Sequence, residues 1–300
     1  MKALSLFVVL LLTTLFLAAR SSAQNEDDVI SVDASIVLLN ATITDANGKA
    51  VHGLAQKQFR VFEDGVEQQI KTFEAEDTPF AAVILIDTSG SMEERVTLAR
   101  SAAIQFLGGI RTFDNVAIYN FDSKVEQVQD FSNTHDLRDQ AFDLKAKGMT
   151  VLNDAVFKAA EDLSKRPEKR RAIIVLSDGA DTLSKRSAEK ALRAALAVNA
   201  TIYTIDMAPA NLDPHDRLVS DGALKNFADK TGGRFVATPG GVAMRDAFKN
   251  IVEELGVQYT LSYEPANTKK DGKWRTIELR VSKPNLTIRT RKGYNAPKTK

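Results

Sequence analysis

The sequence predicts an α/β protein: a doubly wound, mostly parallel sheet flanked by helices, with a smaller β-sandwich formed from the N- and C-terminal segments. Two uninterrupted apolar runs, 81–86 and 172–176, are typical of strands buried on both faces, as a helix-covered parallel sheet requires. Segments with apolar residues at spacings of three and four lie between such runs and predict amphipathic helices. Patterns typical of β structure flank this alternating region on both sides.

The N-terminus carries the pattern of a secretory signal peptide. A basic start at Lys2, an apolar run over 3–19 and the small residues Ser21 and Ala23 predict a signal peptide over 1–23. We therefore expect a secreted or periplasmic protein with no integral membrane span after cleavage. An uncleaved membrane anchor is the alternative, although the run is shorter than the roughly 20 residues that cross a bilayer comfortably.

Three zones follow along the chain, at 29–75, 79–255 and 257–295. The first and third zones are rich in strand patterns, but neither has enough strands to bury a face alone, so we expect them to pair into one small sandwich. The expected strands of these zones are 35–44, 59–62, 258–263, 274–281 and 286–291, with a hairpin at Glu63-Asp64-Gly65 and with Trp274 in the core.

The middle zone alternates strands with helices. Besides the two buried runs, strands are expected at 116–120, 124–129, 201–205 and 234–238, and helices around 96–110, 152–163 and 248–255. In such sheets ligands bind beyond the carboxyl ends of the strands, where the strand order reverses. The functional residues are therefore expected just after the buried strands.

Composition restricts the chemistry available there. Lys and Arg total 40 against 39 Asp and Glu, and the net charge of +1 gives no strong attraction to nucleic acid or anionic lipid. Cysteine is absent, which excludes disulfides, thiolate metal sites and cysteine nucleophiles. The three histidines, His52, His135 and His215, are too scattered for an obvious metal cluster. Carboxylates and hydroxyls must carry any chemistry.

Oxygen-bearing side chains gather at the expected sheet edge. Asp87, Ser89 and Ser91 follow the first buried run, Asp178 follows the second, and Thr150 precedes a predicted helix. Carboxylates and hydroxyls without nitrogen or sulfur suit a hard cation, Mg²⁺ or Mn²⁺, in an octahedral oxygen shell.

This set resembles the metal-ion-dependent adhesion site of von Willebrand factor type A domains, over roughly residues 79–255. The resemblance implies a Rossmann-like sheet with one antiparallel edge strand, here 124–129. It also implies Mg²⁺ as the cofactor, with Mn²⁺ or Ca²⁺ as alternatives. The roles it implies are metal binding through the hydroxyls of Ser89 and Ser91, a contribution of Thr150 in the ligand-bound state, and direct or water-mediated contacts of Asp87 and Asp178. Met149 departs from the family pattern, in which a second glycine is common.

The flanking zones extend the resemblance. The segment Phe59-Arg-Val-Phe-Glu-Asp-Gly65 and the terminal Arg291-Lys-Gly-Tyr294 are similar to those of secreted bacterial proteins called VWFA-related.

Neutral hydroxyl ligands do not neutralise the positive charge of a metal ion, so a metal held mainly by hydroxyls keeps much of its charge. We therefore expect a non-enzymatic, exported binding module whose protein or peptide ligand offers an Asp or Glu carboxylate to the metal. One alternative is a structural subunit of a cell-surface or secretion assembly. A metal-assisted hydrolase is the least favoured reading, because the motif loops contain no His, Lys or Glu placed as a general base.

Each residue also has an ordinary structural explanation. Ser89 and Ser91 are candidates for capping a helix that begins near Met92, and Thr150 for capping the helix over 152–163. Asp154 is expected to brace the start of that helix, and Asp122 and Asp181 to occupy turns or caps.

Overall fold

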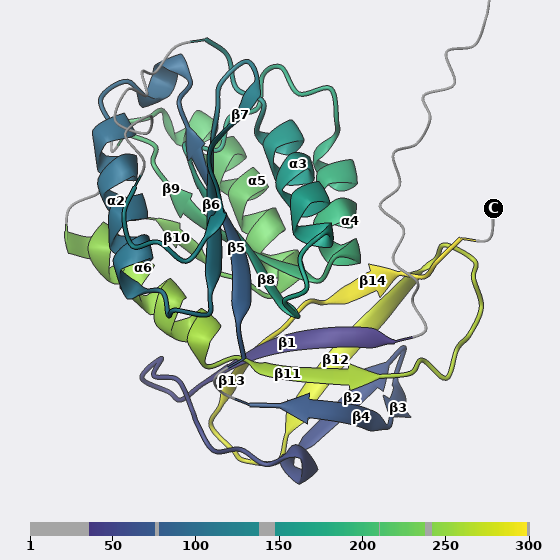
Figure 1. The fold of residues 1–300 in the computed structure, drawn as a ribbon. Helices are drawn as coiled ribbons and strands as arrows, with labels where there is room; N and C mark the ends of the chain where they lie inside the picture. Colours follow the sequence, from purple (N-terminus) through teal and green to yellow (C-terminus); the bar gives the residue numbers. More distant parts are fainter. Residues whose placement is uncertain (1–35, 76–77, 138–147, 210, 238–241, 299–300) are drawn as a thin grey trace, which may run out of the picture.

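The structure is a computed structural model that describes residues 36–298, except 76–77, 138–147, 210 and 238–241. The predicted signal peptide over 1–23 lies outside the described residues. Within these described residues there are three sheets, of six, four and four strands. Figure 1 shows an α/β part with helices on both sides of the six-stranded sheet, and a separate pair of antiparallel sheets at one end of it. This architecture confirms the predicted fold class.

The central sheet has the order β10-β9-β8-β5-β6-β7. All neighbours are parallel except β6 and β7, which confirms the antiparallel edge strand. The chain adds β6 and β7 on one side of β5 and β8 to β10 on the other, so the order reverses between β5 and β8. The strands are β5 (Phe80–Asp87), β6 (Asn115–Phe121), β7 (Val125–Ser132), β8 (Arg170–Ser177), β9 (Ala200–Asp206) and β10 (Phe235–Ala237).

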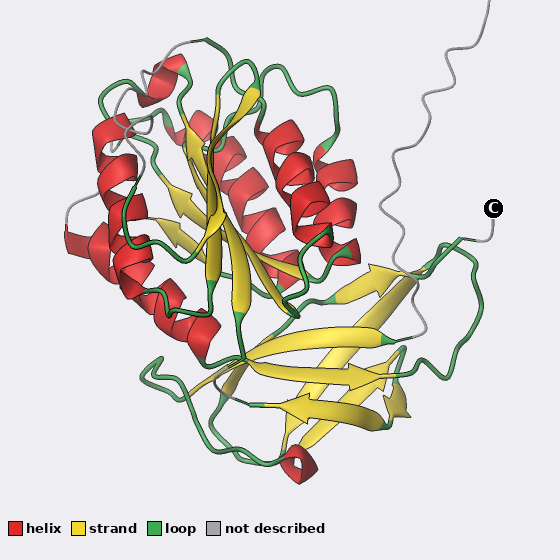
Figure 2. Ribbon diagram, in the orientation of Figure 1, coloured by secondary structure: helices red, strands yellow, loops and turns green. Residues whose placement is uncertain are grey.

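Helices cover both faces of this sheet (Figure 2). Alternate side chains of β5 explain the two layers, because Ile84 and Ile86 pack into one apolar core and Val83 and Leu85 into another. The first core is completed by α2 (Val96–Gly109) and α6 (Val242–Gly256), and the second by α3 (Leu152–Ser164), α4 (Ala188–Ala197) and α5 (Pro214–Thr231).

The helix α5 was not expected, because its segment lacks a clear helical pattern in the sequence. Its buried residues are confined to its second half, at Leu224, Phe227, Ala228 and Thr231, so its first turns carry no apolar periodicity. The helix ends at Gly232, its C-cap, which adopts a left-handed conformation with φ +82°.

The two smaller sheets combine both ends of the described chain. Their orders are β13-β1-β11-β4 and β14-β12-β2-β3, and β1 pairs with β11 while β2 pairs with β12. Their inner faces share one apolar core that includes Leu39, Val61 and Leu261. The strands are β1 (Val37–Thr44), β2 (Phe59–Glu63), β3 (Val66–Gln68), β4 (Ile70–Glu74), β11 (Tyr259–Tyr263), β12 (Trp274–Val281), β13 (Thr287–Arg289) and β14 (Gly293–Asn295).

Trp274 corrects one expectation about this sandwich. Its side chain is 39% exposed rather than part of the core. Alternation along β12 sends Arg275, Ile277 and Leu279 inward, so Trp274 falls on the outer face.

The sandwich packs against the amino ends of the parallel strands. Arg170, at the start of β8, is fully buried and donates from Nε to Thr260 Oγ1 at 3.1 Å and from Nη1 to the Gly256 carbonyl at 3.2 Å. Glu254 of α6 is also buried and accepts from Tyr203 Oη at 3.0 Å and from Thr42 Oγ1 at 3.2 Å. The opposite, carboxyl edge of the sheet is therefore left clear of the sandwich (Figure 1).

Candidate metal centre

Asp87 ends β5 and is completely buried at the carboxyl edge of the sheet. Its Oδ1 accepts from the Ser89 backbone N–H at 2.8 Å, and its Oδ2 accepts from the Ser177 hydroxyl at 2.6 Å. Burial raises the pKa of the Asp87 carboxyl to about 6, the hydrogen bonds from Ser177 and Ser89 oppose that rise, and the nearby charge of Asp178 adds to it. The metal-free protein thus holds a carboxylate in a place that favours compensation by positive charge.

Ser89 and Ser91 lie directly after Asp87, and their hydroxyl oxygens are 3.1 Å apart. Two neighbouring oxygens of an octahedral Mg²⁺ shell, each about 2.1 Å from the metal, are about 3 Å apart. The spacing of the two hydroxyls therefore fits adjacent positions of such a shell.

Helix capping does not account for these serines. A single 3-10 turn, η2 (Gly90–Met92), follows Ser89, whose side chain makes no capping hydrogen bond. The helix α2 begins only at Val96, and its N-cap residue is Arg95. Neither hydroxyl is therefore used at a helix N-terminus.

Thr150 lies on a loop that is fastened to the serine loop and to the loop after β8. The Gly90 N–H donates to the Gly148 carbonyl at 3.1 Å. The Thr150 N–H donates to Thr182 Oγ1 at 2.9 Å, and the Thr150 carbonyl accepts from the N–H groups of Thr182 and Leu183, each at 3.0 Å. Thr150 is buried, and α3 has Val151 as its N-cap without a side-chain cap, so the capping role is not taken by Thr150.

Asp178 follows β8, the strand next to β5 in the sheet. It is 7% exposed, and its Oδ1 accepts from the Ala180 N–H at 3.3 Å. Its charge adds, as a minor cause, to the raised pKa of Asp87. The structure thus gathers three loops at the point where the strand order reverses, and the five residues singled out from the sequence lie on these loops.

Other side chains support the site without appearing in the predicted set. Ser177 donates to Asp87, and its hydroxyl also accepts from the Gly179 N–H at 3.0 Å. Asp181 Oδ2 accepts from the Asn153 N–H at 2.7 Å, so it caps α3 from a distant loop. Asp154 accepts from the N–H groups of residues 185 and 186, so its carboxylate braces that loop rather than the start of its own helix. The sequence did offer one signal for Ser177: it is the polar residue that ends an apolar, buried strand.

The donor set is built from hydroxyls as much as from carboxylates. Within the described residues, no group of three or more His, Cys, Asp or Glu side chains is placed to hold a metal ion. A cation here would depend on Ser89, Ser91 and Thr150, in agreement with the hard, oxygen-only chemistry of the set. His215 is exposed in the first turn of α5, where its N–H donates to Asp213.

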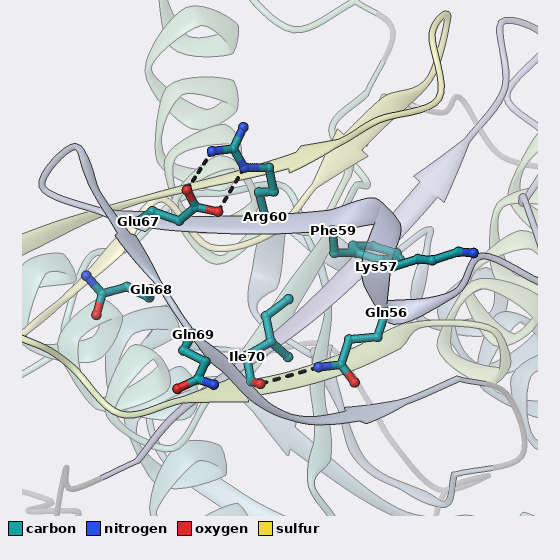
Figure 3. Close-up of a pocket in the computed structure, with 8 residues that line it drawn as sticks. All are labelled: Gln56, Lys57, Phe59, Arg60, Glu67, Gln68, Gln69 and Ile70. Carbon is teal, nitrogen blue, oxygen red and sulfur yellow. Dashed lines mark hydrogen bonds and ion pairs between the residues drawn. The ribbon is translucent and has the colours of Figure 1, made fainter.

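A surface recess of about 490 Å³ lies in the sandwich, and Figure 3 shows its lining. Arg60 and Glu67 form a bidentate ion pair there, and Gln56 donates to the Ile70 carbonyl at 3.3 Å. None of the five candidate metal ligands lines this recess. Separately, no helix in the described ranges is both long enough and apolar enough to cross a lipid bilayer.

Comparison with known proteins finds a family match for part of the α/β region. Residues 82–180 match the family model described as the von Willebrand factor type A domain. No curated protein matches the sequence.

Among solved structures, the fold is similar to that of a von Willebrand factor type A protein from Catenulispora acidiphila. The identity is 13%, the match covers 89% of this chain and 74% of that one, and the TM-score is 0.50. The pilus adhesin SpaC from Lactobacillus rhamnosus GG is similar at 10% identity and a TM-score of 0.50, over 80% of this chain. This chain spans about half of that adhesin, 48%. BatB from Bacteroides thetaiotaomicron matches at 16% identity and a TM-score of 0.48, over 59% of this chain and 98% of that one.

The matched segment begins in β5 and ends just after Asp178, so it contains all five candidate residues. Residues 82–180 therefore match the von Willebrand factor type A domain, and the observed α/β fold agrees with that match.

Proposed function

We propose that the chain is an exported, non-enzymatic binding module that holds a protein or peptide ligand through a divalent cation. The single observation that carries the proposal is the pair of hydroxyls on Ser89 and Ser91, 3.1 Å apart beside the buried Asp87 and unused in helix capping. A bound Mg²⁺ would supply an attraction for an anionic ligand group, and a partner Asp or Glu carboxylate is the protein group that meets it.

The chain's own residues would divide the work. Ser89, Ser91 and Thr150 offer neutral oxygens, which leave positive charge on the ion for the partner. Asp87 and Asp178 supply negative charge in or next to the shell, and each has one oxygen already held by a backbone N–H. These fastened backbones keep the donors in place, so little ordering entropy is lost on binding.

The first test is metal binding itself. Titration calorimetry with MgCl₂ is expected to give a one-site isotherm for the full chain and none for Ser89→Ala. Ser101→Ala is the matched control, because Ser101 lies exposed on α2 and its hydroxyl donates to the Thr97 carbonyl of its own helix. Equal Mg²⁺ binding by the wild type and Ser89→Ala would contradict the proposal.

The ligand is tested with envelope proteins passed over the immobilised full chain in Mg²⁺ and then in EDTA. A protein that is retained only in Mg²⁺, and is not retained by Asp87→Ala, supports the proposal. Retention that neither EDTA nor Asp87→Ala alters favours the second candidate, a structural subunit of a surface assembly. The observation favouring that candidate is the fold likeness to a pilus adhesin. Turnover of ester or phosphoester substrates by the purified chain would contradict the proposal that the protein is not an enzyme.

A further inference from the structure

Two large apolar side chains that are each about half-exposed belong to residues next to the candidate ligand Thr150, one in sequence and one through a backbone hydrogen bond. Met149 is 48% exposed and Leu183 is 47% exposed. Met149 precedes Thr150 in the chain, and the Leu183 N–H donates to the Thr150 carbonyl at 3.0 Å. Their backbones therefore meet at the same residue from two different loops.

Both backbones are held in place. The Met149 N–H donates to Ser123 Oγ at 3.2 Å, and Gly148 before it has φ +82°. A Cβ added at Gly148 would lie 2.6 Å from Ser123 Oγ, so this glycine permits the close approach that positions Met149. On the other side, the Asp181 carboxylate accepts from the Asn153 N–H and from the Ser184 N–H, which holds the loop that carries Leu183. Exposed apolar residues on such fastened loops are already arranged for contact.

We infer that Met149 and Leu183 form an apolar rim that selects the partner's sequence, in which a metal-directed Asp or Glu is flanked by large aliphatic side chains. The inference rests on the proposed function, because the carboxylate anchor is the reason for a ligand to lie here. A carboxylate bound to a metal does not distinguish one acidic residue from another. Contacts of its neighbours with the rim would supply that discrimination, and methionine suits such surfaces because its side chain adapts to different shapes.

The size of the effect follows from the exposed surface. Each of these side chains is already about half-buried, so covering the rest of one is expected to raise affinity about fivefold.

The test is a selection from displayed heptapeptides with Asp at the central position and random residues elsewhere. The full chain is immobilised in Mg²⁺, and bound peptides are released with EDTA and sequenced. Leu, Ile and Met are expected to be enriched next to the Asp. The double variant Met149→Ser/Leu183→Ser is expected to lose this enrichment, and an enriched peptide is expected to bind it about 25-fold more weakly.

Controls separate the rim from the metal centre. Met149→Leu should keep the enrichment, and so should Val66→Ser, which removes an exposed apolar side chain (57%) from β3 of the sandwich. Two results would overturn the rim inference and leave the proposed function standing. One is that the peptides released by EDTA from the wild type show no enrichment of apolar residues next to the Asp. The other is that the double variant selects the same residues as the wild type. If EDTA releases no peptides while MgCl₂ still binds, the rim inference and the carboxylate ligand fail together. If MgCl₂ does not bind either, the metal centre itself fails.

Discussion

Asp87→Asn is expected to stabilise the metal-free protein at neutral pH, although it removes a residue of the candidate metal centre. The folded protein raises the pKa of this carboxyl from an ordinary 3.8 to about 6, chiefly through burial. A raised folded pKa means that the charged form is disfavoured in the fold. The stability contributed by the proton is complete below about pH 3.8 and is lost as the pH rises through about 6.

The magnitude follows from that shift. Two pKa units correspond to about 3 kcal/mol of unfolding free energy above pH 6. Asparagine is neutral throughout, but it must accommodate the Ser177 hydroxyl that donates to Asp87 Oδ2, at a cost of about 1 kcal/mol. The net gain at pH 7.5 is about 2 kcal/mol, or about 4–8 °C in melting temperature for a domain of this size.

The assay is urea unfolding followed by circular dichroism in EDTA, at pH 7.5 and pH 5.0. At pH 5.0 the wild-type carboxyl is one unit below its folded pKa, so the advantage of the variant should shrink by about 1.4 kcal/mol. Asp229→Asn, at an exposed position of α5, serves as the control and should show no such change. An Asp87→Asn variant that is less stable than wild type at pH 7.5, or whose advantage is independent of pH, would refute the reasoning.

Three further outcomes are expected. MgCl₂ should raise the melting temperature of the wild type and of Ser101→Ala but not of Ser89→Ala, and a rise in all three would place the cation elsewhere. Glu254→Gln should cost about 3 kcal/mol in urea unfolding, because the buried carboxylate pairs with two arginines at the junction with the sandwich; a loss under 1 kcal/mol would mean that these pairs contribute little. Gly233→Ala should prevent stable folding, because an added Cβ would lie 1.9 Å from the Ile202 carbonyl oxygen, and a normal melting curve would show that the backbone there can move.

Local pattern was sufficient for much of the fold. Strands buried on both faces must be apolar at every position, so 81–86 and 172–176 were recognisable as the centre of a parallel sheet. Elements with weak local patterns were missed. The first turns of α5 bury little, and β3, β4 and β14 are short strands at sheet edges.

The candidate residues could be named from the sequence because a parallel sheet sends every strand's carboxyl end to one edge. Their supporting contacts could not be named in the same way. Ser177 and Asp87 are 90 positions apart, and nothing in either segment specifies that β5 and β8 are neighbours. The exposure of Met149 and Leu183 likewise depends on loops that meet only in the folded chain.

The sequence by itself determined the fold class, the strands of the central sheet, three of the helices packed on it (α2, α3 and α6), and the kind of atoms available at the sheet edge. The tertiary structure decided which strands are neighbours, how the two β segments pair, and which hydroxyls remain free of helix caps. The physical reason is that periodicity and composition act over a few residues, whereas register, burial and electrostatic proximity arise between segments that folding brings together.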